Sequence, residues 1–358
     1  MNTTGNYFAV AVPGTEPALL AELQELGITS AVPEHGGVAW SGPHDEAEQI
    51  AGRALTPTRI LYRITDFPVS RFAELVRKTA GLPWEELLQQ PGFSVRAVCH
   101  RSKLYHSSAV EQRVRAGIEQ RLAATGSDAL ISPSSDPDTR APDTRTMVVV
   151  RIDHNHCQLS ITLGKADLYQ RGYRLETAKA PLRENLAAVL LQLSGWEGHE
   201  PLYDPFCGSG TIPIEAALLS VRRKIPAPQI FASDRDAGAC RITASNAERA
   251  GAAGLIHISN HAISDLRNEH GQAAHIVTNP PYGKRVNSRR DLRNLYARFG
   301  TVLRTSFAGS RLTMLCTAGT DGDILAGQLG IPLTTVASFS NGGLPVAVRR
   351  GAIPAEAM

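Results

Sequence analysis

The sequence predicts an α/β protein, in which a doubly wound, mostly parallel sheet with an antiparallel edge hairpin follows an α+β region. Beyond Gly164, short apolar strands alternate with helical patterns, as in βαβ units. Segments 334–340 and 344–350 are typical of a hairpin around Asn341-Gly342, because Asn-Gly suits a type I′ turn. The run 132–145 is rich in Ser, Pro and Asp and has too few apolar residues to pack, so we expect a loop or partly disordered insert.

Composition limits the class of protein. The 358 residues are 42% hydrophobic, enough for two or more domains, and the net charge of +3 neither requires nor excludes RNA binding. The five cysteines are scattered without a C-x-x-C pair, so we expect reduced thiols, a cytoplasmic location and no structural metal. No run approaches the roughly eighteen apolar residues that cross a bilayer, so we expect no membrane association.

The first half shows strand and helix patterns in an order typical of an α+β layer. Strands are expected at 7–12, 37–40, 59–64, 93–99, 147–152 and 157–162, and helices at 16–26, 45–53, 67–80 and 109–123. The last two strands predict a hairpin around His154-Asn155. His154 and His156 are interpreted as residues of the hairpin tip, because no further ligands lie near them in the sequence.

The second half supplies the strands of the parallel sheet. They are expected at 202–204, 229–234, 256–258, 275–278 and 311–317, with helices between them. The change of pattern places a domain boundary near 164–175.

The turn Asp204-Pro205-Phe206-Cys207-Gly208-Ser209-Gly210 follows the first of these strands. Gly208 and Gly210 permit a tight turn and close approach of a ligand, and Thr211 can cap the next helix. Such a turn directs free N–H groups at a ligand above the carboxyl ends of the strands. Alone the pattern is weak evidence, because the same glycines allow tight packing of a strand against a helix.

Asp234 strengthens the interpretation as a nucleoside site. It ends the second strand, where a carboxylate can accept hydrogen bonds from both hydroxyls of a ribose. The same side chain can also cap a helix that starts at Asp236. The glycines are not followed by Gly-Lys-Ser/Thr, so S-adenosylmethionine fits better than a nucleoside triphosphate. Asp265 can accept from an adenine amino group or be a solvated acid in its loop.

Asn279-Pro280-Pro281-Tyr282 leaves the strand 274–278 at the same edge of the sheet. The Asn279 carboxamide oxygen and the Pro280 carbonyl can each accept one N–H of a planar amine, and the prolines hold both acceptors still. Tyr282 can stack on the ring that carries the amine. Such a cage favours methyl transfer to an exocyclic nitrogen, whose lone pair is otherwise delocalised into the ring. The alternative is a proline turn that only ends the strand.

Cys207 needs a separate comparison, because methyl transfer to a base carbon uses a nucleophilic cysteine beside proline. No cysteine of this chain precedes a proline, and Cys207 lies inside the glycine turn. We therefore expect a packing role for its side chain.

Four segments together make the chain resemble the THUMP-domain class I RNA methyltransferases, above all those that methylate guanine N2 in large-subunit ribosomal RNA. These are 204–210, 279–283, 168–174 and 180–186, and the resemblance extends to 102–107 and 110–113. It implies a ferredoxin-like unit at 1–65, a THUMP RNA-binding domain at 66–165 and a class I methyltransferase domain at 166–358. Lys284 departs from the glutamate that relatives often have there.

The resemblance implies roles for particular residues. The catalytic residues would be Asn279, Pro280 and Tyr282. S-adenosylmethionine would be held by Asp204, Pro205, Cys207, Gly208, Gly210, Thr211, Asp234, Asp265 and Asn279. RNA phosphates would be contacted by Arg101, Lys103, Arg113, Arg171, Arg174, Lys284 and Arg285, although any single arginine could equally belong to a solvated surface.

Two alternatives remain open. The tetrapeptide also serves methyl transfer to adenine N6, cytosine N4 or a protein glutamine. A noncatalytic RNA-binding or assembly protein that keeps the fold is the second alternative.

Overall fold

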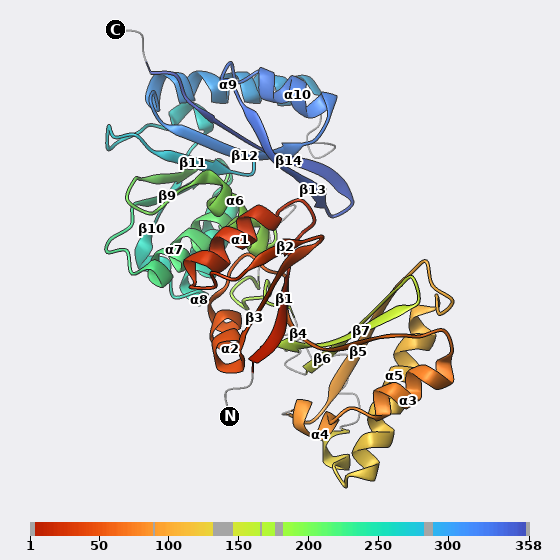
Figure 1. Ribbon diagram of the computed structural model, residues 1–358. Coiled ribbons are helices and arrows are strands. Elements are labelled where there is room, and N and C mark those ends of the chain that lie inside the picture. The colour runs from red at the N-terminus through yellow and green to blue at the C-terminus, as the bar shows by residue number, and fades with distance from the viewer. Residues whose placement is uncertain are drawn as a thin grey trace. The chain divides into compact units, whose positions relative to one another are not determined.

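A computed structural model describes residues 4–88, 90–131, 146–164, 167–175, 182–282 and 289–355. The predicted insert 132–145 therefore lies outside the described residues. The chain divides into two compact units, shown in Figure 1. The first unit contains residues up to Val10 and Leu26–Leu168, and the second contains Ala11–Glu25 and the chain from Tyr169 onward.

The first unit is built on a seven-stranded sheet with strand order β2-β3-β1-β4-β7-β6-β5. Its strands are β1 (Thr4–Val10), β2 (Val32–Glu34), β3 (Gly37–Pro43), β4 (Arg59–Pro68), β5 (Phe93–His100), β6 (Thr146–Asp153) and β7 (His156–Leu163). Strands β5 and β6 pair in parallel, while the other described pairs are antiparallel. A parallel pair needs a crossover, and α5 lies in this connection.

The helices of the first unit bury one face against this sheet. They are α2 (His44–Arg53), α3 (Phe72–Ala80), α4 (Trp84–Leu87), α5 (Ser107–Ala124) and the 3₁₀ helix η1 (Asp128–Leu130). Val110, Val114 and Ile118 follow helical spacing on α5, and all three are fully buried. A Cβ on Gly117 would lie 2.9 Å from the Val76 carbonyl oxygen, so glycine allows α3 and α5 to approach closely.

The predicted hairpin at the end of the first unit is confirmed. His154 and Asn155 have φ values of 49° and 61°, as a type I′ turn requires. The start of the predicted helix 67–80 is wrong, because Phe67 pairs with Cys157 in the β4–β7 ladder and α3 begins only at Phe72. Strand β2 and helix α4 were not predicted, since both are too short to show a period.

The second unit contains the predicted doubly wound sheet, with strand order β10-β9-β8-β11-β12-β14-β13. Its strands are β8 (Leu202–Asp204), β9 (Ile230–Asp234), β10 (Ile256–Asn260), β11 (His275–Thr278), β12 (Arg311–Thr317), β13 (Thr334–Asn341) and β14 (Leu344–Ala352). The first five are parallel, and β14 runs antiparallel between β12 and β13. The strand order reverses at β8, which places a crevice at its carboxyl end.

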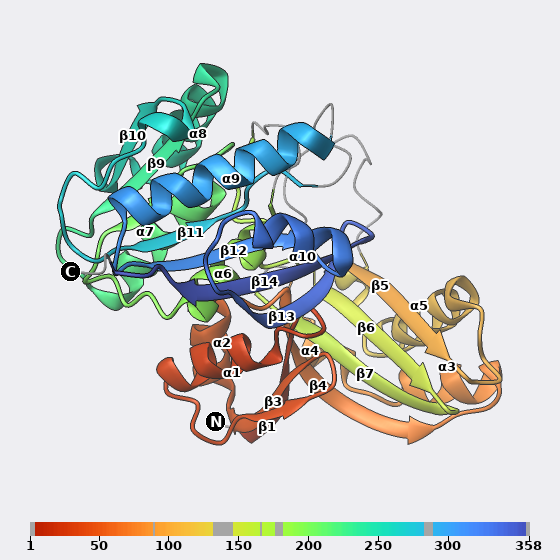
Figure 2. The same ribbon diagram turned by 90° about the horizontal axis from the view of Figure 1, so that it is seen from above.

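Helices cover both faces of the second sheet (Figures 1 and 2). They are α6 (Glu184–Ser194), α7 (Thr211–Arg223), α8 (Ala237–Arg249), α9 (Arg289–Ser306) and α10 (Thr320–Gly327), with 3₁₀ helices η2 (Ala253–Leu255) and η3 (Ile263–Asp265). Figure 1 shows α9 and α10 on one side of the strands and α6 and α7 on the other. Phe299 and Leu303 of α9 share one core with Ile276 and Met314 of the sheet.

The edge hairpin forms as predicted, but its turn lies one residue later. Asn341 pairs with Leu344, so the two turn residues are Gly342 and Gly343, with φ values of 58° and 81°. Two glycines adopt these values more easily than Asn-Gly, because neither carries a Cβ.

Helix α1 (Glu16–Glu25) belongs by its contacts to the second unit, although it follows the first strand of the chain. Arg222 of α7 pairs with Glu22, and Arg223 Nε lies 2.7 Å from Glu25 Oε1. The hydrogen bond from Arg223, with the positive charges of Arg222 and Arg223, holds the pKa of Glu25 down at about 2 against the effect of burial. The helix itself was predicted from its apolar spacing, whereas its partners were not.

Candidate active site

The glycine turn follows β8 and leads into α7. Gly208 and Gly210 have φ values of 57° and 81°, in the left-handed region that glycine adopts without strain. A Cβ on Gly210 would lie 2.7 Å from Thr243 Cγ2, whereas a Cβ on Gly208 would meet nothing within 4 Å. Gly210 therefore fits the turn against α8, and Gly208 faces open space where a ligand could approach.

Helix α8 holds the back of this turn. Thr243 Oγ1 donates to the Gly208 carbonyl at 3.1 Å, and Asn246 Nδ2 donates to the Ser209 carbonyl at 2.9 Å. Cys207 is buried beside Thr243, and its pKa is raised well above the usual value by a hydrogen bond with Cys240 and by burial. A thiol that resists ionisation is suited to packing rather than nucleophilic attack. Sequence reasoning missed Thr243 and Asn246, which no local motif marks.

Asp234 ends β9 and reaches the same turn. Its Oδ2 accepts from the Gly208 N–H at 3.1 Å, and its Oδ1 accepts from the Asp236 N–H at 3.0 Å. The cap of α8 is Asp236, whose side chain accepts from the Gly238 N–H at 2.8 Å. The alternative role of Asp234 as a helix cap is therefore wrong, and its carboxylate faces the glycine turn instead.

Asp204 joins the glycine turn to the Asn279 segment. Strands β8 and β11 are neighbours in the sheet, and Thr278 Oγ1 donates to Asp204 Oδ1 at 2.6 Å. Asp204 is 2% exposed, and burial raises the pKa of its carboxyl to about 7, against the hydrogen bonds from Thr278 and the Phe206 N–H. The two sequence motifs therefore meet at one edge of the sheet.

The Asn279 segment presents an unsatisfied acceptor at this edge. Within the described part of the chain, Asn279 Oδ1 is buried and accepts no hydrogen bond. Leaving such an oxygen unpaired costs about 1–3 kcal/mol, so a ligand that donates an N–H to it would recover this free energy. Pro281 O accepts from Tyr296 Oη at 3.4 Å, which fixes the segment to α9. Tyr282 is only 3% exposed, so its predicted stacking on a base stays a prediction.

The remaining predicted site residues differ in their burial, and two of them lie outside the described part of the chain. Asp265 lies exposed in η3, where its Oδ1 accepts from Ser264 Oγ at 3.3 Å. Pro205 and Thr211 are buried within the turn. Lys284 and Arg285 lie outside the described residues.

Arg171 and Arg174 are placed where a phosphate contact is disfavoured. Arg171 Nε lies 2.8 Å from Glu215, which is fully buried, and Tyr173 Oη donates to the same carboxylate at 3.0 Å. Arg174 pairs with Glu184 at 3.2 Å and donates to the carbonyl oxygen of Leu182. With side-chain exposures of 12% and 16%, both arginines fasten their segment to α6 and α7, which argues against their predicted RNA contacts.

Basic residues of the first unit remain candidates for RNA contact. Arg101, Lys103 and Arg113 are exposed, and none forms an ion pair with the residues that the structure describes.

Beside the tip of the β6–β7 hairpin, atoms of His100, Asp153 and His154 that could bind a metal ion lie within 4.8 Å of one another. His156 is separate, because its Nε2 pairs with Asp66 at 2.8 Å.

Two family models match the chain. Residues 171–323 match the RMKL-like methyltransferase domain, and residues 6–61 match the RlmL ferredoxin-like domain. The matched range 171–323 includes the glycine turn, Asp234 and the Asn279 segment, so the methyltransferase resemblance seen in the sequence is confirmed. In the described ranges, no helix combines the length and apolarity needed to span a bilayer.

Similar proteins align with nearly the whole chain and not only with the methyltransferase domain. The ribosomal RNA large subunit methyltransferase K/L of Syntrophotalea carbinolica is 31% identical over 96% of this chain and 53% of the relative. The enzyme of the same name from Vibrio parahaemolyticus is 27% identical over 95% and 52%. The chain thus spans about half the length of these relatives. A Synechocystis protein, named provisionally as an RNA methyltransferase, is 28% identical over 96% of this chain and 95% of the relative.

Solved structures share the fold of both units. A Listeria monocytogenes protein described as a predicted N6-adenine-specific DNA methylase has a TM-score of 0.80 at 25% identity and covers 97% of this chain and 96% of that one. TrmN from Thermus thermophilus has a TM-score of 0.76 at 23% identity, covering 98% and 100%. A chain solved in complex with SAH has a TM-score of 0.81 at 23% identity, covering 100% of both.

Proposed function

We propose that this chain is an S-adenosylmethionine-dependent RNA methyltransferase that modifies the exocyclic N2 amine of a flipped guanine, in 23S ribosomal RNA or in tRNA. The methyltransferase domain supports the reaction class, and the K/L relatives support ribosomal RNA as substrate. The N-terminal α+β region, which includes the THUMP domain expected from the sequence, would bind the RNA. The observation that carries the proposal is the buried, unpaired Asn279 Oδ1 beside the glycine turn.

The residues of the turn fit a nucleoside without phosphates better than a nucleoside triphosphate. Gly208 leaves one face of the turn open, and the Asp234 carboxylate lies against that turn, where it could exchange a backbone N–H for ribose hydroxyls. No lysine follows the glycines to neutralise a phosphate. A relative fold with SAH bound agrees with this choice of cofactor.

The Asn279 segment would orient the amine. Asn279 Oδ1 and the Pro280 carbonyl would each accept one N–H of the base, which turns the nitrogen lone pair toward the cofactor. When bound, S-adenosylmethionine supplies an electrophilic methyl group. The amine has no need of a base in the transition state, because it can release its proton to solvent after the transfer.

The test is methyl transfer from radiolabelled cofactor to unmodified RNA. Asn279→Ala is expected to lower kcat at least a hundredfold while RNA affinity stays within a few-fold, since the substitution removes positioning and no phosphate contact. Asn6→Ala is the control, because Asn6 is an exposed asparagine of the first unit, where its Oδ1 accepts from Ser41 Oγ. Full activity in Asn279→Ala would refute the amine cage.

Measurements of methyl transfer and of cofactor binding distinguish two competing functions. Label that enters adenine N6, cytosine N4 or a protein glutamine would identify another amine methyltransferase, and the Listeria structure is described as an adenine-N6 enzyme. A noncatalytic RNA-binding protein would show no saturable uptake of S-adenosylmethionine. Mapping the labelled nucleotide by mass spectrometry would assign the substrate.

A further inference from the structure

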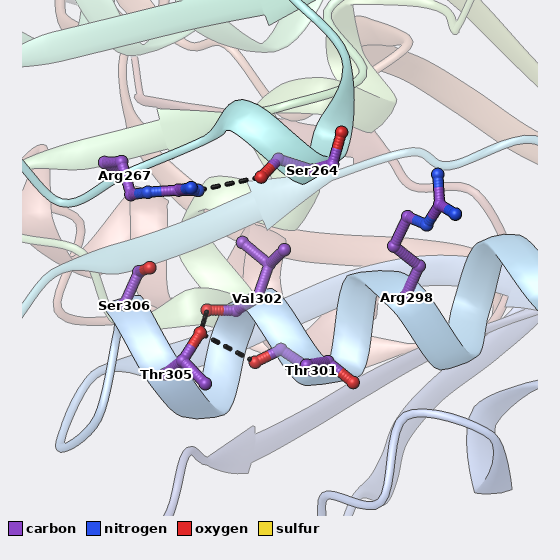
Figure 3. A pocket seen from close by; sticks show the side chains of 7 residues that line it. All are labelled: Ser264, Arg267, Arg298, Thr301, Val302, Thr305 and Ser306. Carbon is purple, nitrogen blue, oxygen red and sulfur yellow. Dashed lines mark hydrogen bonds between the residues drawn. The ribbon is translucent and has the colours of Figure 1, made fainter.

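A groove lies between the η3 segment and helix α9 (Figure 3). Its cavity volume is about 770 Å³. It is lined by Val302, by the hydroxyl-bearing side chains of Ser264, Thr301, Thr305 and Ser306, and by the arginines Arg267 and Arg298. A surface of this composition can bind an anion, because guanidinium groups donate several hydrogen bonds in a fixed plane.

The two arginines are the donors that remain available. Arg267 Nη1 donates to the carbonyl oxygens of Ser264 and Leu266, each at 2.8 Å, which fixes the side chain and leaves its other N–H groups. Figure 3 shows Arg298 rising from α9 toward the η3 segment. Among the residues that the structure describes, neither guanidinium pairs with a carboxylate. Charge-assisted bonds to a phosphate would satisfy both.

The groove hydroxyls contribute shape rather than donors. Thr301 Oγ1 donates to the Ala297 carbonyl at 3.2 Å, and Thr305 Oγ1 donates to the Thr301 carbonyl at 3.1 Å. Ser264 Oγ donates to Asp265 Oδ1 at 3.3 Å. Asp265 is the acidic residue beside the groove, so two positive charges face one negative charge there.

A polar stripe on α9 runs beside the Asn279 segment. Arg290, Asn294, Arg298, Thr301 and Thr305 are all exposed and recur at helical spacing on one face. The segment contacts this helix at Tyr296, whose Oη donates to the Pro281 carbonyl oxygen at 3.4 Å. Arg298 follows Tyr296 by two residues, so the stripe passes close to the segment. At 1.5 Å per residue, the stripe extends about 22 Å from Arg290 to Thr305.

We propose that this groove binds the phosphodiester backbone of the substrate RNA. The inference rests on the proposed function, and it assigns Arg267 and Arg298 to the substrate path. The extended stripe favours a strand over a small anion, because it runs for several turns along α9 past both the Asn279 segment and Arg298.

The experiment compares single charge removals on one helix. Arg298→Gln removes a groove guanidinium, and Arg293→Gln removes an exposed arginine on another face of α9. RNA dissociation constants are measured by fluorescence anisotropy from 50 to 300 mM salt. Each phosphate contact in a single strand contributes about 0.7 to the slope of log K against log salt. Arg298→Gln and Arg267→Gln are expected to lower the slope by about 0.7 each, and Arg293→Gln is expected to leave it unchanged.

Each outcome decides the proposal. Equal slopes for Arg298→Gln and Arg293→Gln would overturn it, as would a groove that binds inorganic phosphate without any change in RNA affinity. Calorimetric binding of S-adenosylmethionine should be the same in all variants, which shows that the cofactor site is intact. A wild-type protein that binds RNA but transfers no methyl group would refute the proposed function and leave the groove assignment standing.

Discussion

Asp204 is a fully buried carboxyl at the junction of the two motifs, and its ionisation should control stability. The pKa of this group is about 7 in the folded chain, above its ordinary value of 3.8, chiefly because of burial. A raised pKa means that the neutral form stabilises the fold below about pH 4 and that this contribution is lost as the pH rises through 7. The shift corresponds to a loss on the order of 4 kcal/mol.

Asp204→Asn should therefore flatten the pH dependence. Its melting temperature relative to the wild type should increase between pH 5 and pH 8, because asparagine keeps an acceptor for Thr278 and cannot ionise. Thermal unfolding followed by circular dichroism measures this difference. Parallel curves for the two proteins would show that Asp204 is already ionised in the fold.

The two glycines of the turn should respond differently to alanine. Gly208→Ala places a Cβ in open space at a φ of 57°, so we expect a stability cost of about 1–2 kcal/mol and a weaker affinity for S-adenosylmethionine. Gly210→Ala also forces the Cβ to within 2.7 Å of Thr243, so a larger cost of about 2–4 kcal/mol is expected. Urea unfolding and calorimetric titration separate the two effects. Equal costs at both positions would contradict the turn geometry.

Among the helices, α1 provides the clearest electrostatic test. The pKa of Glu25 is held at about 2 by Arg223, below the ordinary 4.5. A lowered pKa means that this pairing stabilises the fold above pH 4.5 and loses its effect as the pH falls toward 2. Since the Glu25 side chain is 31% exposed, we expect the contribution to be about 1 kcal/mol after solvent screening.

Glu25→Gln should thus lower the free energy of unfolding at pH 7 and lower it by about half as much or less at pH 3, because the folded carboxyl with its pKa of about 2 stays largely ionised there. Urea unfolding at both pH values measures the difference. Glu16→Gln, at the other end of the same helix, is the matched control. An equal loss at pH 3 and pH 7 would show that packing rather than charge explains the effect of the Glu25 substitution.

Local patterns predicted most helices and strands, because apolar periodicity and turn residues act over a few positions. Local patterns do not show which distant residue a side chain will contact. Arg171 was assigned to RNA from its charge and from the resemblance of its segment to the family, whereas its partner Glu215 lies 44 residues further along the chain. The same limitation explains why Thr243 and Asn246 were missed behind the glycine turn.

Across both units, the sequence predicted the doubly wound sheet, its antiparallel edge and the meeting of the two motifs. The parallel strand pattern dictates that the carboxyl ends lie together, so Asp204 and Thr278 could be expected near each other. The sequence did not predict that α1, which follows the first strand of the first unit, belongs to the second unit. Helix α1 has the same apolar pattern whichever sheet it covers, and its bonds to Gln192, Arg222 and Arg223 are what tie it to the second unit.

Because α1 packs in the second unit, the ribosome completes this helix long before the helix it pairs with. Arg223 is synthesised 198 residues after Glu25, and this delay is about 10–40 s at ordinary rates of translation. During this interval the nascent chain carries an amphipathic helix without its docking partner. The second unit can reach its final form only after α1 docks on it, so its biosynthesis depends on a segment translated 198 residues before the partner of that segment.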